Sequence, residues 1–236
     1  EYGTTLSYQE LNAENSKLVE KIGKRCLVFC FCQNSIGSIM GYTAFINSNI
    51  PTVVLNAHLD EELRDVLLDN YKPSYLWLPK EQLDSFQNME KVYETYGYAL
   101  LKTHFDVEYP LYDELCLMLT TSGSTGSPKF VRQSYKNVLS NARSIVEYLE
   151  LDETERPITT LPMNYTYGLS IINSHLLVGA TILVTDKGLM QKEFWEFFRE
   201  QKATSFGGVP YTYEMLDKLR FFRMNLPSLR YMTQAG

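Results

Sequence analysis

Residues 115–119 read Leu-Cys-Leu-Met-Leu, and residues 121–129 read Thr-Ser-Gly-Ser-Thr-Gly-Ser-Pro-Lys. The first segment is apolar throughout and has the length of a buried strand. The second segment is rich in hydroxyls and glycines, contains no acidic residue and ends in Lys129. Glycines adopt positive φ and leave neighbouring backbone N–H groups accessible, so such a loop can bind phosphate oxygens. The two segments together predict a strand that ends in an anion-binding loop at the carboxyl edge of a sheet.

Strand-like and helix-like segments alternate along the rest of the chain. Ser7 and Glu10 have the spacing of a capping box, which begins a helix that Gly23 ends. Several of the strand segments are apolar on both faces, as in parallel sheets covered by helices. The predicted fold class is α/β, with stacked, mainly parallel sheets flanked by helices. We expect strands at 25–32, 51–55, 74–78, 98–103, 115–120, 130–133, 157–161, 180–185, 204–206 and 229–233, and helices at 35–48, 59–69, 135–149, 169–177, 190–201 and from Pro210.

Composition excludes several function classes for these 236 residues. The net charge is −6 and no long run of lysine or arginine occurs, so nucleic acid is not an expected partner. The longest apolar stretch, 168–184, is interrupted by polar residues at 173–175 and is too short to span a bilayer. We therefore expect no membrane span and a cytoplasmic location.

The four cysteines and three histidines do not suggest a metal site. Cys26, Cys30 and Cys32 fall in one apolar run, Cys116 lies in another, and the histidines are scattered. Structural metal sites need several such ligands at characteristic spacings. We interpret the cysteines as reduced core residues and expect no metal ligand in this chain.

The loop at 121–129 does not fit the commonest phosphate-binding motifs. A Walker A loop places Gly-Lys-Ser/Thr at the start of a helix, whereas Lys129 follows Pro128 and precedes an apolar pair. The glycine spacing of the dinucleotide-binding fingerprint is also absent. On composition alone, an ordinary serine- and glycine-rich surface loop is the alternative interpretation.

Residues 121–129 resemble the phosphate-binding signature of the AMP-forming adenylating superfamily, a Ser/Thr/Gly-rich run that ends in Thr-Gly-x-Pro-Lys. That superfamily comprises acyl-CoA synthetases, luciferase-like enzymes and the adenylation domains of peptide synthetases. The similarity extends over most of the chain and corresponds to the N-terminal portion of these enzymes. Other similar segments are 5–11, 30–44, 134–138, where Tyr135 replaces the usual histidine, 161–168, and 207–213 with its Gly-Val-Pro.

The resemblance implies a ligase that uses ATP and Mg²⁺ to convert a carboxylate into an acyl-adenylate and pyrophosphate. The acyl group would then pass to a thiol, of coenzyme A or of a carrier protein. The implied phosphate-binding residues are Thr121, Ser122, Gly123, Ser124, Thr125, Gly126 and Lys129. The family's catalytic lysine and its acidic Mg²⁺ residue lie downstream of the last matching residue, so we expect no catalytic residue here and no adenylation by residues 1–236 alone.

On the acyl side, the resemblance places Tyr165, Tyr167 and Gly168 beside the carboxylate substrate. From the residues alone, the favoured interpretation of the two tyrosines is sheet-edge aromatics with ordinary hydroxyl partners, and only the resemblance favours a place in the pocket lining. Family members that activate α-amino acids carry an aspartate where this chain has Thr166. An uncharged threonine cannot compensate a buried ammonium, so we expect a substrate without an α-ammonium group, with an amino-acid-type adenylation domain as the alternative.

By analogy with the family, residues 25–150 would form a first α/β lobe carrying the phosphate loop. Residues 1–24 with 151–236 would form part of a second lobe, and the family's C-terminal domain is not represented. Two other function classes stay open, a non-catalytic module that binds nucleotide or phosphate and a phosphotransferase that releases ADP. We interpret His175 as a helix residue with a local partner.

Overall fold

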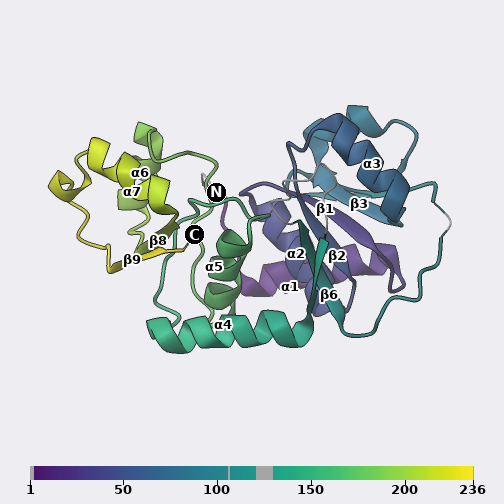
Figure 1. The fold of residues 1–236 in the computed structure, drawn as a ribbon, viewed down its shortest axis with the longest axis horizontal. Coiled ribbons are helices and arrows are strands. Elements are labelled where there is room, and N and C mark those ends of the chain that lie inside the picture. Colours follow the sequence, from purple (N-terminus) through teal and green to yellow (C-terminus); the bar gives the residue numbers. More distant parts are fainter. Residues whose placement is uncertain (1–2, 106, 121–129, 236) are drawn as a thin grey trace. The chain divides into compact units, whose positions relative to one another are not determined.

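The computed structural model describes residues 3–105, 107–120 and 130–235 (Figure 1). Their contacts divide the chain into two compact units. The N-terminal unit is Thr5–Asn137, and the C-terminal unit comprises Glu1–Thr4 with Val138–Gly236. Within the described residues, no helix combines the length and the apolar composition needed to cross a bilayer.

The described part of the N-terminal unit contains a seven-stranded sheet with the order β4-β5-β3-β1-β2-β6-β7. β3, β1, β2 and β6 run parallel, whereas β4, β5 and β7 pair antiparallel at the two sides. This sheet confirms the predicted α/β class with mainly parallel strands. The elements are α1 (Tyr8–Ile22), β1 (Val28–Cys32), α2 (Ile36–Asn47), β2 (Thr52–Asn56), α3 (Glu61–Tyr71), β3 (Tyr75–Pro79), η1 (Lys80–Phe86), β4 (Glu90–Thr95), β5 (Tyr98–Lys102), β6 (Leu115–Thr120), β7 (Phe130–Ser134) and the start of α4 (Tyr135–Leu149).

Helices cover both faces of this sheet, with α3 on one side and α2 on the other (Figure 1). Phe29 and Phe31 of β1 pack in one buried cluster with Leu67 of α3. On the opposite face, Trp77 of β3 is fully buried and its Nε1 donates to Gly37 O of α2 at 2.9 Å. Because both faces are covered, the strands are apolar throughout rather than alternating.

The capping box predicted at the first helix is confirmed. Ser7 Oγ accepts from Glu10 N at 3.2 Å, and Glu10 Oε2 accepts from Ser7 N at 2.8 Å. Gly23 ends α1 with φ 71, a value that favours glycine. α1 packs against α2, where the Asn15 side-chain amide lies 3.0 Å from the Thr43 hydroxyl. The structure therefore groups α1 with the N-terminal unit, and the lobe boundaries expected for the complete enzyme stay a prediction.

The hairpin formed by β4 and β5 was not expected from the sequence. Its two-residue turn consists of Tyr96 and Gly97, both with positive φ. Turns of this kind match the twist of paired strands. The sequence of β4 lacks the apolar pattern of a buried strand, because β4 is largely charged and partly exposed, as edge strands often are.

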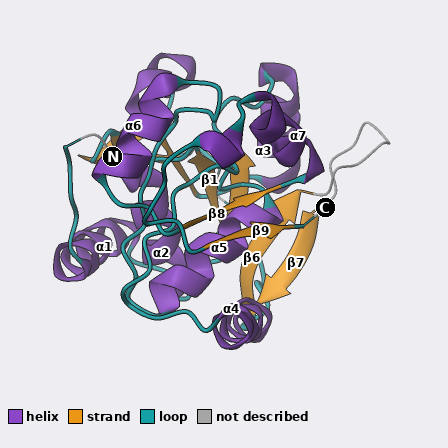
Figure 2. Ribbon diagram, turned by 90° about the vertical axis from the view of Figure 1, so that its left-hand side faces the viewer, coloured by secondary structure: helices purple, strands orange, loops and turns teal. Residues whose placement is uncertain are grey.

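In the sequence the predicted phosphate loop follows β6 and precedes β7, and these two strands form an antiparallel pair (Figure 2). Residues 121–129 are outside the described residues. Their flanking residues Thr120 and Phe130 are paired with each other at the carboxyl end of β6. Since β1, β2 and β3 run parallel to β6, all four strands end at the same edge of the sheet.

The C-terminal unit contains a shorter two-stranded parallel sheet among its described residues. The predicted strands 157–161 and 180–185 appear only as isolated bridges. Pro157 has no N–H group that could donate to a neighbouring strand. Further along the segment, the Thr159 hydroxyl bonds the backbone of Thr185, donating to its O at 3.0 Å and accepting from its N at 2.9 Å. The elements are α5 (Thr166–Leu177), α6 (Lys192–Glu200), β8 (Ser205–Gly208), α7 (Pro210–Lys218), η2 (Phe221–Arg223) and β9 (Tyr231–Gln234).

Replacing Gly41 of α2 by alanine is expected to lower the free energy of unfolding by about 1–3 kcal/mol, the usual cost of overpacking a core. A Cβ at this position would overlap the buried Trp77 indole. The urea-unfolding midpoint measures the effect. Gly188→Ala is the matched control, because a Cβ there would meet nothing closer than 3.9 Å. Equal midpoints for the two variants would contradict the prediction.

Candidate functional site

The phosphate-binding residues predicted from the sequence stay a prediction. They are Thr121, Ser122, Gly123, Ser124, Thr125, Gly126 and Lys129, and all lie outside the described residues. The three predicted acyl-side residues are described, and they lie together at the start of α5. Tyr165 is the N-cap, Tyr167 belongs to the first turn, and Gly168 follows it.

The start of α5 is held close to the segment that precedes it. Gly168 is buried, and a Cβ at this position would overlap Pro162 O and lie 3.2 Å from Leu161 Cβ. Tyr165 N donates to Pro162 O at 3.0 Å, which closes the turn, while the Tyr165 side chain is 40% exposed. Gly168 therefore allows α5 to begin in close contact with Leu161 and Pro162, and Tyr165 is partly exposed to solvent.

The Tyr167 hydroxyl lies at the carboxyl ends of β8 and β9. It donates to Thr233 Oγ1 of β9 at 2.6 Å, and Tyr213 Oη of α7 donates to Thr233 O at 2.7 Å. Gly207 of β8 pairs in register with Thr233, and a Cβ on it would lie 3.1 Å from the Tyr167 hydroxyl. We call these four residues, Tyr167, Gly207, Tyr213 and Thr233, the Tyr167 cluster.

The Tyr167 cluster offers neutral hydrogen-bonding groups. Burial raises the pKa of Tyr167 from its ordinary value, although its hydrogen bond to Thr233 acts in the opposite direction. Burial also raises the pKa of Tyr213. Both phenols are therefore protonated at neutral pH and act as donors. None of the four residues is a carboxylate that could pair with a ligand ammonium.

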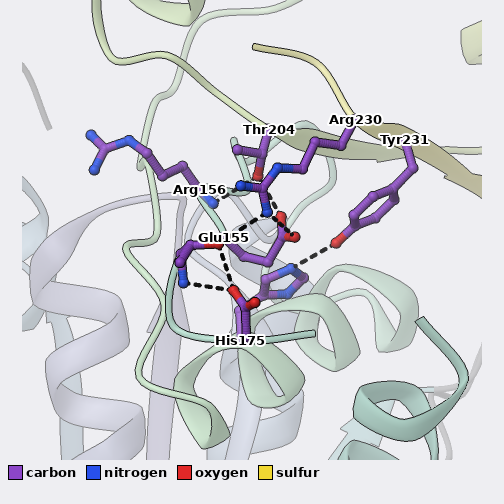
Figure 3. A network of polar contacts seen from close by, with 8 residues as sticks. Glu155, Arg156, His175, Thr204, Arg230 and Tyr231 are labelled. Atoms are coloured by element: carbon purple, nitrogen blue, oxygen red, sulfur yellow. Dashed lines mark hydrogen bonds and ion pairs between the residues drawn. The ribbon is translucent and has the colours of Figure 1, made fainter. Parts of the chain in front are cut away.

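An ion pair between a buried carboxylate and a half-exposed arginine lies at the amino ends of the same two strands (Figure 3). The Glu155 carboxylate is 4% exposed and accepts from Arg230 Nη1 at 2.8 Å and from Thr204 Oγ1 at 2.5 Å. Thr204 precedes β8 and Arg230 precedes β9. Arg156 N donates to the same Thr204 hydroxyl at 2.8 Å, so the carboxylate and its partners connect the chain before both strands.

His175 is buried in the last turn of α5 and uses both ring nitrogens (Figure 3). Nδ1 lies 2.8 Å from Ile171 O, and a carbonyl only accepts, so Nδ1 carries the proton. Nε2 lies 3.3 Å from Tyr231 Oη and therefore accepts from the phenol. Burial lowers the pKa of His175 and raises the pKa of Tyr231 to about 12, which keeps this arrangement neutral.

The prediction that His175 has a local partner is confirmed by its contact with Ile171 O, but the other residues that converge around His175 were not expected from the sequence. Glu155 belongs to a charged stretch, 150–157, that resembles an exposed connection. Thr204, Arg230 and Tyr231 approach it only because β8 and β9 pair in parallel. Periodicity along the chain carries no signal for contacts of this kind.

Among the described residues there is no cluster of three or more metal-ligating side chains. In the ranges 3–105, 107–120 and 130–235, no three histidine, cysteine, aspartate or glutamate side chains converge on a point that could hold a metal ion. A magnesium site needs carboxylate oxygens or phosphates at about 2.1 Å. We therefore assign no chemical step to a metal held by these residues.

The α/β sheet, with a Thr-Gly-x-Pro-Lys sequence directly after β6, agrees with the resemblance to the AMP-forming adenylating superfamily. A comparison with protein families agrees, because the model of the AMP-binding enzyme family matches residues 1–236. The chain belongs to this family, which confirms the resemblance that the sequence indicated.

Two of the curated relatives that the chain matches are named as ligases. A 2-succinylbenzoate–CoA ligase from Oceanobacillus iheyensis is 26% identical over 208 residues, which cover 81% of this chain and 42% of that protein. A D-alanine–D-alanyl carrier protein ligase from Staphylococcus aureus is 23% identical over 193 residues, which cover 79% and 39%. The chain thus spans about two fifths of the length of these relatives.

Solved structures share the fold. An O-succinylbenzoate coenzyme A synthetase (MenE) from Bacillus subtilis in complex with AMP matches with a TM-score of 0.75 and 20% identity, over 99% of this chain and 62% of that one. The N-terminal domain of FACL13 from Mycobacterium tuberculosis matches with a TM-score of 0.76 and 17% identity, over 96% and 61%. At these identities the likeness shows the fold alone, and it confirms the predicted architecture.

Replacing His175 by glutamine is expected to flatten the dependence of stability on pH between about pH 5 and 7. The pKa of the buried imidazole is lowered in the folded state, so below its ordinary value of 6.5 the unfolded state binds the proton more readily. Neutral His175 therefore contributes its whole share of the free energy of unfolding above pH 6.5. That contribution is lost as the pH falls toward the pKa of the folded state. The unfolding midpoint measured across this range reports the slope.

His58→Gln is the control for this experiment, because His58 is an exposed histidine. It should leave the slope close to that of the unchanged protein. A slope in the His175→Gln variant equal to that of the unchanged protein would show that His175 does not couple folding to protonation.

Proposed function

We propose that the complete protein carrying this chain is an AMP-forming ligase. It uses ATP to convert a carboxylate into an acyl-adenylate with release of pyrophosphate, and passes the acyl group to the thiol of coenzyme A or of a carrier protein. The observation that carries this proposal is the family match over residues 1–236 together with a Thr-Gly-x-Pro-Lys loop directly after β6. We further propose that the protein acts in the cytoplasm.

The loop between β6 and β7 is proposed to bind the phosphates of ATP. One hydrogen bond to a charged group contributes on the order of 1.5–3 kcal/mol, so the several donors of Thr121–Lys129 must act together. The pairing of Thr120 with Phe130 supports this role, because it keeps both ends of the loop at the carboxyl edge of the sheet. Mg²⁺, when bound in the complete protein, would neutralise charge on the departing pyrophosphate.

Tyr165, Tyr167 and Gly168 are proposed to line the carboxylate pocket. The Tyr167 cluster is compatible with a carboxylate because it contains no acidic side chain that would repel one, and Thr166 supplies no charge for an α-ammonium. We therefore propose a substrate without that group. One relative is named for D-alanine, so the alternative, activation of an amino acid, belongs in the same substrate panel.

Lys129→Ala in the complete protein is expected to lower kcat/KM for ATP by about 10- to 100-fold, the effect of removing one charged contact to phosphate. Pyrophosphate release with a panel of plain carboxylates and amino acids measures it. Lys192→Ala is the control, since that lysine is 85% exposed and pairs with Glu196 on the surface of α6.

The products of the same assay separate the alternatives. AMP and pyrophosphate support the proposal, whereas ADP would identify a phosphotransferase. Binding of ATP without turnover of any carboxylate would identify a non-catalytic nucleotide-binding module. Turnover confined to α-amino acids would contradict the proposed substrate class.

A further inference from the structure

Helix α5 contacts strand β9 through hydroxyl groups at two separate points. In the first turn, Tyr167 donates to Thr233 at 2.6 Å. In the last turn, His175 accepts from Tyr231 at 3.3 Å. Tyr231 and Thr233 are two residues apart and therefore project from the same face of the strand. The two hydrogen bonds therefore join both ends of α5 to the same face of β9.

The space between the two contacts is filled. Tyr167, Ile171 and His175 follow one another at intervals of four residues and so form one stripe along α5. Ile171 packs over Gly207 of β8 so closely that a Cβ on the glycine would overlap its Cδ1. The same Ile171 contributes the carbonyl that fixes the His175 tautomer, at 2.8 Å from Nδ1. The stripe therefore connects the His175 contact to the Tyr167 contact through packed atoms.

The position of β9 itself is fixed at its amino end. Arg230 N donates to Thr204 O at 2.7 Å, and the Arg230 guanidinium pairs with the buried Glu155 carboxylate. These contacts precede the register in which Ser205 pairs with Tyr231 and Gly207 with Thr233. A shift of β9 by one residue would move the Tyr231 and Thr233 side chains to the other face and break both contacts with α5.

We propose that His175 and Tyr231 are positioning residues for the carboxylate pocket. Through α5 and β9 they hold the Tyr167 hydroxyl at Thr233, and Glu155 with Arg230 supports them by fixing the register of β9. This inference rests on the carboxylate-activating function proposed above. His175 and Tyr231 act through Tyr167, which is proposed to line the carboxylate pocket, so their effect is expected on the binding of the carboxylate rather than on that of ATP.

The test in the complete protein is Tyr231→Phe, which removes the hydroxyl and keeps the ring. The KM for the carboxylate is expected to rise about three- to tenfold, the fold-change that corresponds to one hydrogen bond, while the KM for ATP stays within about twofold. His175→Gln is expected to act in the same direction. Tyr148→Phe is the matched control, because Tyr148 of α4 is 84% exposed.

A double-mutant cycle distinguishes positioning from a general loss of stability. If Tyr231 acts through Tyr167, the effect of Tyr231→Phe on the carboxylate KM should largely disappear when Tyr167→Phe is already present. Effects that simply add, or equal changes in the KM for both substrates, would overturn the positioning role. An unchanged carboxylate KM in Tyr231→Phe would overturn it as well.

The experiment distinguishes an error in the proposed ligase activity from an error in the positioning role. If the unchanged protein releases no pyrophosphate with any carboxylate of the panel, the proposed ligase activity is wrong and the positioning role is refuted with it. Normal activity in the unchanged protein with an uncoupled cycle refutes the positioning role alone.

Discussion

Parallel pairing of buried strands is the constraint on which the N-terminal unit depends. β3, β1, β2 and β6 lie side by side in the same direction, so each connection must return to the opposite edge before the next strand begins. The returning segments include α2 and α3, which cover the two faces and exclude water from them. The same constraint brings the carboxyl ends of all four strands to one edge. A loop that follows β6 begins at that edge, which is where α/β proteins bind ligands.

The strands of the C-terminal unit also pair in parallel, but fewer backbone pairs hold them together. Its sheet has two short strands within the described residues, and side chains make connections that a longer ladder would otherwise make. Thr159 bonds the backbone of Thr185, and the buried Glu155 carboxylate joins the segments before β8 and β9. A buried carboxylate is costly unless it is paired and hydrogen-bonded. Arg230 and Thr204 together meet that condition, so this polar group specifies how β9 enters the sheet.

Much of the fold was predictable because its signals are local. The capping box at Ser7 and Glu10, the apolar strands and the αL glycine at Gly23 each depend on residues near one another in the chain. The elements that were not predicted correctly also have a physical explanation. The charged edge strand β4 lacks an apolar pattern because it has a neighbour on only one side, and Pro157 interrupts a segment whose composition otherwise indicates a strand.

By itself the sequence determined the α/β class and the family, since these follow from local patterns and from residue types at fixed spacing, while the phosphate-binding role of residues 121–129 stays a prediction. It also identified Tyr167 and Gly168 as residues of interest. The tertiary structure alone decided what they contact. The partner of Tyr167 is Thr233, 66 residues away, and the partner of His175 is Tyr231, 56 residues away. Such pairs form only after β8 and β9 align and α5 packs on them, and a single sequence does not encode that alignment in any periodic pattern.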